Sequence, residues 1–298
     1  MSSDGFRYGV SLYSYTDDYG TVLTLEDAFA QIADLGATGI EILGEAHIPG
    51  YPDPYPAWID HWHALLAQYR LEPTSYGSWL DTRLTVSRDM TVAEAVADLI
   101  RDIKLASILG FRFVRPKIGV VSIDLRPDPV WEEAVRRVLD LAAASNIVIC
   151  PEIHAPTPIR HPIVERYVEF IERTGTRNFG LLIDTGIFQD RPLPYWPGET
   201  AEMRRTFLNG IHVDPQDFLP IAKYVVFIQA KFHHINRNLE DEHIPWRAVL
   251  PVLRRANYTG YLSSEYEGSR EPWRSLEQVR RQHALLRRIE AELEQIDP

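Results

Sequence analysis

The sequence predicts an α/β protein folded as a closed (β/α)8 TIM barrel, and three observations lead to this prediction. Short β-rich runs alternate with longer amphipathic runs along all 298 residues, which is typical of parallel βαβ units. Eight such units can be traced, the number that closes a barrel. No glycine-rich dinucleotide motif follows the first strand, which disfavours an open doubly wound sheet. We therefore expect a single barrel domain over 1–298, with loop insertions near 44–57 and 185–200.

Local signals justify the elements in chain order. Thr24 and Thr91 each precede an acidic residue three positions later, the pattern of a capping box. Gly36 and Gly110 are expected just beyond two helix ends, and Pro129 in the first turn of another helix. The strands are expected at 8–12, 39–43, 73–76, 111–115, 147–153, 179–184, 225–230 and 260–265. The helices are expected at 24–35, 57–70, 91–109, 128–144 and 164–173, and an apolar stripe over 276–293 predicts the last one.

Composition excludes several classes of protein. The 24% charged and 45% hydrophobic residues are ordinary for a globular chain and disfavour disorder. A net charge of −11 disfavours binding to a nucleic-acid backbone. The single cysteine, Cys150, cannot form an intrachain disulfide, which fits a reducing compartment. No secretory signal or membrane-spanning run is visible. We expect a cytoplasmic protein with neither nucleic-acid nor membrane partners.

Polar side chains gather at the predicted strand ends, where barrels of this kind form their active sites. Glu152, Asp184 and Glu265 lie at the ends of strands five, six and eight. Converging carboxylates repel one another unless a cation lies between them, and oxygen ligands favour magnesium or manganese. The alternative is that each acid pairs with an arginine or lysine at the rim.

Five short motifs mark the predicted strand ends, namely Gly39-Ile-Glu-Ile-Leu43, Pro151-Glu-Ile-His154, Leu182-Ile-Asp-Thr185, Gln229-Ala-Lys231 and Ser264-Glu-Tyr-Glu267. Together they resemble the strand ends of the xylose isomerase-like TIM-barrel superfamily of sugar isomerases and epimerases. The resemblance implies a metal site formed by Glu152, Asp184, Gln229 and Glu265. A histidine is usual in the third position, but the amide oxygen of Gln229 can bind magnesium or manganese and shifts the preference away from zinc.

A finer resemblance lies in the stretches 8–15, 150–157 and 228–232, which are similar to catalytic α subunits of C-glycoside deglycosidases. Those enzymes cleave the carbon–carbon bond between an oxidised sugar and an aromatic aglycone. The resemblance implies a sugar or glycoside substrate, a smaller second subunit and an oligomer. A keto-sugar isomerase or epimerase is the nearest alternative. An endonuclease-IV-like nuclease and a non-catalytic barrel subunit are less favoured.

His154 is the expected catalytic base, because it lies two residues beyond Glu152 on the same face of a strand. The alternative is a structural histidine that contacts a backbone carbonyl. Glu152 and Glu265 would exchange protons in an isomerase, and Lys117 is a further catalytic candidate. The expected substrate-binding residues are Glu45, His47, Trp79, Arg115, Phe188, Lys231 and His233.

Structural alternatives remain open for most of these residues. Arg115 and Lys117 would serve only structure if they merely paired with Glu41. Only one of the adjacent side chains His233 and His234 can readily reach the site. The remaining alternatives are a solvated Glu267 on a loop and aromatic side chains that only pack between loops.

Overall fold

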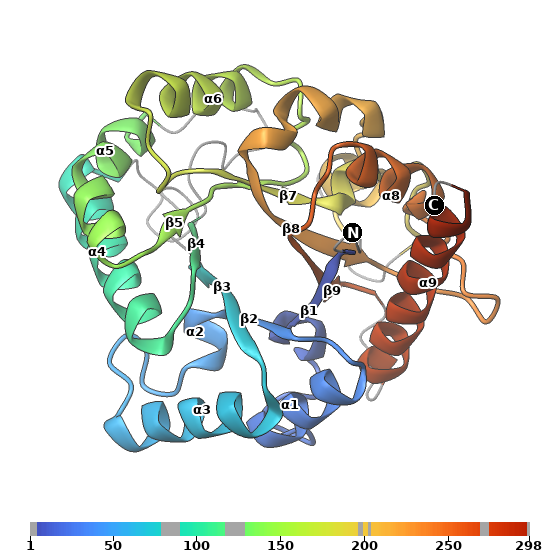
Figure 1. Ribbon diagram of the computed structural model, residues 1–298, viewed down its shortest axis with the longest axis horizontal. Coiled ribbons are helices and arrows are strands. Elements are labelled where there is room, and N and C mark those ends of the chain that lie inside the picture. Colours follow the sequence, from blue (N-terminus) through green and yellow to red (C-terminus); the bar gives the residue numbers. More distant parts are fainter. Residues whose placement is uncertain are drawn as a thin grey trace.

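The computed structural model describes residues 5–78, 90–116, 129–195, 199–201, 204–268 and 274–296, and it confirms the barrel. Nine parallel strands form one sheet in the order β5-β4-β3-β2-β1-β9-β8-β7-β6. The ring is seen end-on in Figure 1. The strands are β1 (Arg7–Ser11), β2 (Gly39–Leu43), β3 (Glu72–Ser78), β4 (Phe113–Pro116), β5 (Val148–Ile149), β6 (Glu152–Ile153), β7 (Leu181–Asp184), β8 (Val225–Phe232) and β9 (Tyr261–Tyr266).

The predicted fifth strand is divided into β5 and β6. Pro151 lies between the halves and has no amide proton to donate to a neighbouring strand. Its carbonyl still accepts from the amide of Leu182 at 3.2 Å, and the amide of Cys150 donates to Val114 at 2.9 Å. β5 pairs with β4 and β6 pairs with β7, so this one segment closes the ring.

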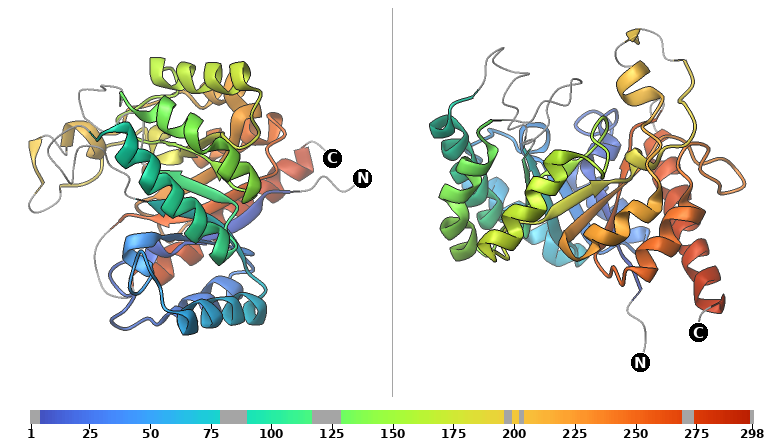
Figure 2. Two further views of the ribbon diagram at one scale, coloured as in Figure 1. Left: turned by 90° about the vertical axis from the view of Figure 1, so that its left-hand side faces the viewer. Right: turned by 90° about the horizontal axis from the view of Figure 1, so that it is seen from above.

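Helices surround the ring of strands (Figures 1 and 2). The segment around the π-helix η3 projects beyond the barrel body in both views of Figure 2. No helix in the described parts of the chain is long and apolar enough to cross a membrane. The helices are η1 (Leu12–Tyr15), α1 (Leu25–Asp34), α2 (Gly44–His47), α3 (Pro56–Tyr69), α4 (Val92–Leu109), α5 (Trp131–Ala144), α6 (Pro162–Thr174), η2 (Thr185–Phe188), η3 (Arg204–Leu208), η4 (Pro215–Tyr224), α8 (Trp246–Arg255) and α9 (Arg274–Ile296).

The predicted helix boundaries are largely confirmed. Both capping boxes form, and the hydroxyl of Thr24 accepts from the Asp27 amide at 3.1 Å. Gly110 ends α4 in the left-handed conformation, with φ of 85°. The helix expected from residue 128 begins at Trp131 instead, because Pro129 and Val130 form a turn before it.

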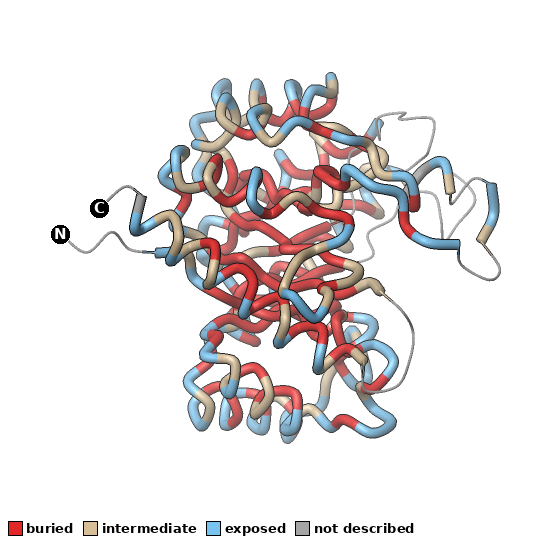
Figure 3. Tube along the Cα trace, turned by 90° about the vertical axis from the view of Figure 1, so that its right-hand side faces the viewer, coloured by how far each residue is buried: buried red, intermediate tan, exposed pale blue. Residues whose placement is uncertain are grey.

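The barrel interior is layered along the strands. Buried apolar side chains of β7, β8 and β9, namely Leu182, Phe227 and Tyr261, pack together with Cys150 at one level. Side chains two and four residues further along each strand point to the same face. The interior beyond this apolar layer is therefore lined by the polar side chains at the strand ends. Figure 3 shows the strands as the buried centre of the molecule.

Candidate active site

The strand register brings the predicted acidic residues together. Asp184 on β7 lies beside Gln229 on β8, and Lys231 on β8 lies beside Glu265 on β9. All four side chains are buried, with 0–4% of their surface exposed. Because these strands are neighbours and parallel, their carboxyl ends meet at one side of the barrel mouth.

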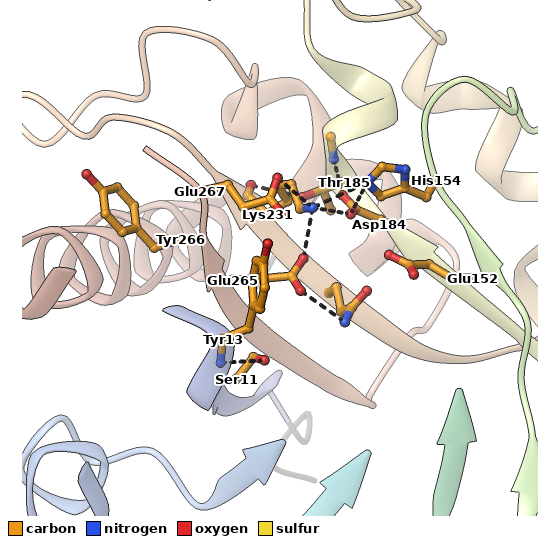
Figure 4. A network of polar contacts seen from close by, with 12 residues as sticks. Ser11, Tyr13, Glu152, His154, Asp184, Thr185, Lys231, Glu265, Tyr266 and Glu267 are labelled. Carbon is orange, nitrogen blue, oxygen red and sulfur yellow. Dashed lines mark hydrogen bonds and ion pairs between the residues drawn. The ribbon is translucent and has the colours of Figure 1, made fainter. Parts of the chain in front are cut away.

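Lys231 lies at the centre of this group (Figure 4). Its Nζ is 3.0 Å from Asp184 Oδ2, 3.0 Å from Glu265 Oε2 and 3.1 Å from Glu267 Oε2. The Nε2 of His154 is 3.4 Å away. A cation therefore does lie between the converging carboxylates, and it belongs to the protein itself. The prediction of Lys231 as a substrate-binding residue did not anticipate this position, in which three acids surround its ammonium.

A second set of contacts lies on the other side of Glu265. The Gln229 amide donates to Glu41 Oε1 at 2.5 Å and faces Glu265 Oε1 at 3.4 Å. The Ser263 hydroxyl donates to Glu41 Oε2 at 2.9 Å. The amide nitrogen of Gln229 donates toward the two carboxyl groups of Glu41 and Glu265, so its carbonyl oxygen faces away from them. That oxygen is buried and receives no hydrogen bond from the described residues.

Arg115 on β4 holds Glu152 through a buried ion pair of 2.9 Å. The sequence left open whether Arg115 contacts substrate or pairs with Glu41. The structure shows a different arrangement, since Arg115 forms its ion pair with Glu152. Arg115 is 3% exposed, so it acts first on the conformation of that carboxylate.

Burial and negative charge shift the carboxyl pKa values. Burial raises the pKa of Asp184 to about 6, of Glu265 to about 7 and of Glu41 to about 8. Burial also acts to raise the pKa of Glu267, but the Lys231 ammonium outweighs it and lowers that pKa to about 2. Burial acts to lower the pKa of Lys231, but the carboxylates around it raise that pKa well above its ordinary value. The group is therefore short of positive charge.

The residues present fit a divalent cation. Glu152, His154 and Asp184 offer ligand atoms that all lie within 4.8 Å of one another. Asp184 Oδ2 and Glu265 Oε2 are buried and accept no well-oriented hydrogen bond within the described chain, although the Lys231 ammonium lies beside both. Among the described residues, the five carboxyl groups of Glu41, Glu152, Asp184, Glu265 and Glu267 face two permanently charged basic side chains, those of Arg115 and Lys231.

The ring of His154 is oriented by the backbone carbonyl of the next residue, Ala155. Its Nδ1 faces the carbonyl oxygen of Ala155. A carbonyl only accepts, so in the neutral imidazole Nδ1 carries the proton and Nε2 presents a lone pair. Nε2 lies 3.6 Å from Asp184 Oδ2. The side chain is 26% exposed, so it is more open to solvent than Asp184 or Lys231.

Other predicted substrate-binding residues do not join this group. Phe188 is 2% exposed within the hydrophobic core, so its ring is covered and offers no face for a sugar. His47 is 4% exposed, with Nδ1 2.9 Å from the Leu43 amide nitrogen, and burial lowers its pKa to about 4. Glu45 is exposed on the short helix α2. Trp79 and Lys117 lie outside the described residues.

His233 borders the group through Glu267. Its Nδ1 is 3.1 Å from the backbone oxygen of Glu267. Burial lowers its pKa to about 4.

Three participants were missed or undervalued by the sequence reasoning, namely Glu41, Ser263 and Glu267. Glu267 was considered a solvated loop residue, whereas it pairs with Lys231. The signal was present, because Ser263, Glu265 and Glu267 alternate along one face of a strand. Glu41 stands between two isoleucines in a buried strand, a placement that also required a polar partner.

The fold and the site define the class: a (β/α)8 barrel with a buried acidic centre at the carboxyl ends of its strands. Residues 29–289 match the family model described as the xylose isomerase-like TIM barrel. The chain therefore belongs to this family, as the strand-end motifs indicated.

Relatives and solved structures agree with this assignment. The chain is 27% identical to the 3'-dehydrocarminate deglycosidase alpha subunit of Microbacterium sp, over 97% of this chain and 96% of the relative. It is 25% identical to a C-glycoside deglycosidase alpha subunit of Arthrobacter globiformis, over 100% of this chain and 96% of the relative. A solved L-ribulose 3-epimerase superposes with a TM-score of 0.66 at 18% identity, covering 98% of each chain, and this likeness supports the fold.

Proposed function

We propose that the chain is a divalent-metal-dependent sugar-processing enzyme, and specifically a lyase that cleaves the carbon–carbon bond of oxo-sugar C-glycosides. The observation that carries the proposal is the convergence of Glu152, His154 and Asp184 within 4.8 Å at the barrel mouth. The names of the two full-length relatives, both deglycosidase alpha subunits, support this substrate class. Their designation as alpha subunits also supports a second subunit as a partner.

The residues that would hold the cation are Glu152, Asp184 and Glu265, joined by Gln229. Binding through Gln229 requires its amide group to turn over, because its nitrogen, not its oxygen, now faces Glu41 and Glu265. The donors of this set are carboxylate and amide oxygens, which favour manganese or magnesium. When bound, such an ion stabilises the negative charge that develops on adjacent sugar oxygens. Arg115 fixes the orientation of Glu152 through their buried ion pair.

His154 is the proposed base. Its Nε2 carries the lone pair in the tautomer set by Ala155, and its partly exposed ring borders the acidic group. It would take a proton from the oxidised sugar, either from a hydroxyl or from the carbon beside the carbonyl, so that the bond to the aromatic aglycone can break. The aglycone leaves with the electron pair of the broken bond as a stabilised carbanion. Its carbon then takes up a proton to give the free phenolic compound, and the sugar keeps a new double bond.

A keto-sugar isomerase or epimerase is the second candidate. Such a reaction needs two groups that exchange protons on opposite faces of the substrate. Glu152 on β6 and Glu265 on β9 enter the site from different strands, which could place one carboxyl group on each face of a bound sugar.

Product analysis separates the two candidates. The protein is loaded with Mn²⁺ and incubated with a C-glucoside that carries a ketone on its sugar ring, and the products are followed by chromatography and NMR. Free aglycone supports the lyase, whereas a stereoisomeric keto-sugar without aglycone release supports the epimerase and contradicts the lyase. Product formation that is unchanged by a chelator contradicts metal dependence.

A further inference from the structure

We propose that Lys231 is an internal competitor of the divalent cation, and that Glu267 is the carboxylate that receives its ammonium when the cation binds. This inference rests on the proposed metal site and assigns roles to two residues that are not ligands in it. It accounts for the presence of a buried lysine among the very carboxylates that would bind a metal.

The competition follows from shared oxygens. Lys231 Nζ lies 3.0 Å from Asp184 Oδ2 and 3.0 Å from Glu265 Oε2, and both residues are proposed ligands. The lysine side chain is only 5% exposed, so water screens its charge poorly. A divalent cation and an ammonium that use the same two carboxylates repel each other strongly in such surroundings.

Glu267 offers the ammonium a different partner. Its Oε2 is 3.1 Å from the same Nζ, and its side chain is 29% exposed, in contrast to 0% and 5% for Asp184 and Glu265. Figure 4 shows Glu267 beside Lys231 with Asp184 and Glu265 on the remaining sides. A small movement of the flexible lysine toward Glu267 would keep its charge paired and free the two inner carboxylates.

The net charge of the three carboxylates and one ammonium also matches the charge of one divalent cation. Asp184, Glu265 and Glu267 with Lys231 carry two excess negative charges when ionised. One divalent cation would neutralise them while the Lys231 ammonium remains within the group, paired with Glu267. In the metal-free protein Lys231 balances part of this charge, so it stabilises the metal-free site as well as competing for it.

The test is a double-mutant cycle on metal affinity with Lys231→Met and Glu267→Gln. Calorimetric titration with Mn²⁺ should show affinity raised about tenfold or more in Lys231→Met, because a buried like charge has been removed. Affinity should fall in Glu267→Gln, because Lys231 is then held only by the inner carboxylates. In the double variant, Glu267→Gln should have a much smaller effect than in the wild type.

Thermal unfolding gives a second readout that does not depend on activity. Metal-free Lys231→Met should unfold at a lower temperature than the wild type, and added Mn²⁺ should raise its unfolding temperature by more. The matched control is Lys223→Met, since that lysine is 71% exposed and pairs with Glu172 at 3.6 Å on the surface. The Lys223→Met variant should have the same Mn²⁺ affinity as the wild type.

Three results separate failure of this inference from failure of the proposed function. Equal Mn²⁺ affinity in the wild type, Lys231→Met and Glu267→Gln overturns the competition while leaving the metal site intact. If Glu267→Gln changes Mn²⁺ affinity equally in the wild type and in Lys231→Met, the proposal that Glu267 receives the ammonium is overturned. Absence of Mn²⁺ binding in every variant overturns the proposed metal site as well.

Discussion

Two parts of the barrel mouth differ in what their polar residues do. On the side of β6 to β9, Asp184, Lys231 and Glu265 converge on one buried group. On the side of β2, His47 turns into the protein and Glu45 out to solvent. The residues on the first side are on strands, where side-chain direction follows a period of two. Those on the second side belong to the short helix α2, which strand periodicity does not position.

The largest difference in turnover is expected between variants that remove a carboxylate charge on the β6 to β9 side and a variant that removes one on the β2 side. Asp184→Asn and Glu265→Gln should each lower turnover by about 100-fold or more, because each removes a carboxylate from the site that stabilises charge in the reaction. Glu45→Gln is the matched control on the β2 side and should leave turnover nearly unchanged. Turnover with the oxo C-glucoside measures the effect, and circular dichroism verifies folding. Equal losses in all three variants would abolish the distinction between the two sides.

His154→Ala tests the expected base. Turnover should fall by about 10²–10⁴-fold, the usual contribution of a positioned general base, while Mn²⁺ affinity stays close to that of the wild type. Steady-state kinetics and calorimetry supply the two measurements. A large loss of Mn²⁺ affinity would instead make His154 a ligand, consistent with its place near Glu152 and Asp184, and would contradict its assignment as the base.

His47→Ala should affect stability rather than chemistry. The imidazole is buried against the Leu43 backbone and lies 5.3 Å from the Tyr19 ring. Its loss should cost about 1–3 kcal/mol of unfolding free energy, since it leaves a cavity and an unpaired backbone group. Urea unfolding and turnover per folded molecule provide the comparison. Unchanged stability with a strong loss of turnover would contradict this structural role and show that His47 acts in the active site.

The buried carboxyl groups predict a pH dependence of the metal-free protein. Burial raises the pKa of Glu265 to about 7, of Asp241 to about 7 and of Glu41 to about 8. Unfolded carboxyls titrate near pH ~4. The folded state therefore binds more protons than the unfolded state between those values, and this contribution makes stability fall as the pH rises.

Buried histidines act in the opposite direction only at lower pH. Burial lowers the pKa values of His47 and His233 to about 4, so their contribution to stability rises with pH up to about 6.5, where the unfolded imidazole titrates. Between pH 6.5 and 8 the carboxyl groups should dominate. Urea unfolding in chelator should show a lower free energy of unfolding at pH 8 than at pH 6.5. The opposite slope would contradict the raised carboxyl pKa values.

Much of this architecture could be predicted from sequence. The βα alternation and the capping residues Thr24, Thr91 and Gly110 depend on local chemistry, which a single sequence displays. The position of Asp184 and Glu265 at the ends of the two strands that flank β8 follows from topology. The break in the fifth strand was not foreseen, although Pro151 could have indicated it.

Other features could not be predicted because they depend on contacts between distant segments. The Lys231 ammonium pairs with carboxylates from β7 and β9. Arg115 forms its ion pair with Glu152 and not with Glu41, because the barrel brings Glu152 next to it. Phe188 illustrates the converse case. Its place after a strand indicated a loop, whereas the helical turn η2 directs it into the core.

A Mn²⁺ titration of metal-stripped protein tests the central claim most directly. The wild type should bind one ion per chain, and Asp184→Asn should lose most of that affinity while Glu45→Gln retains it. This result would place the cation at the carboxyl ends of β6 to β9. Binding that is absent from the wild type, or equally strong in Asp184→Asn, would contradict a metal centre there.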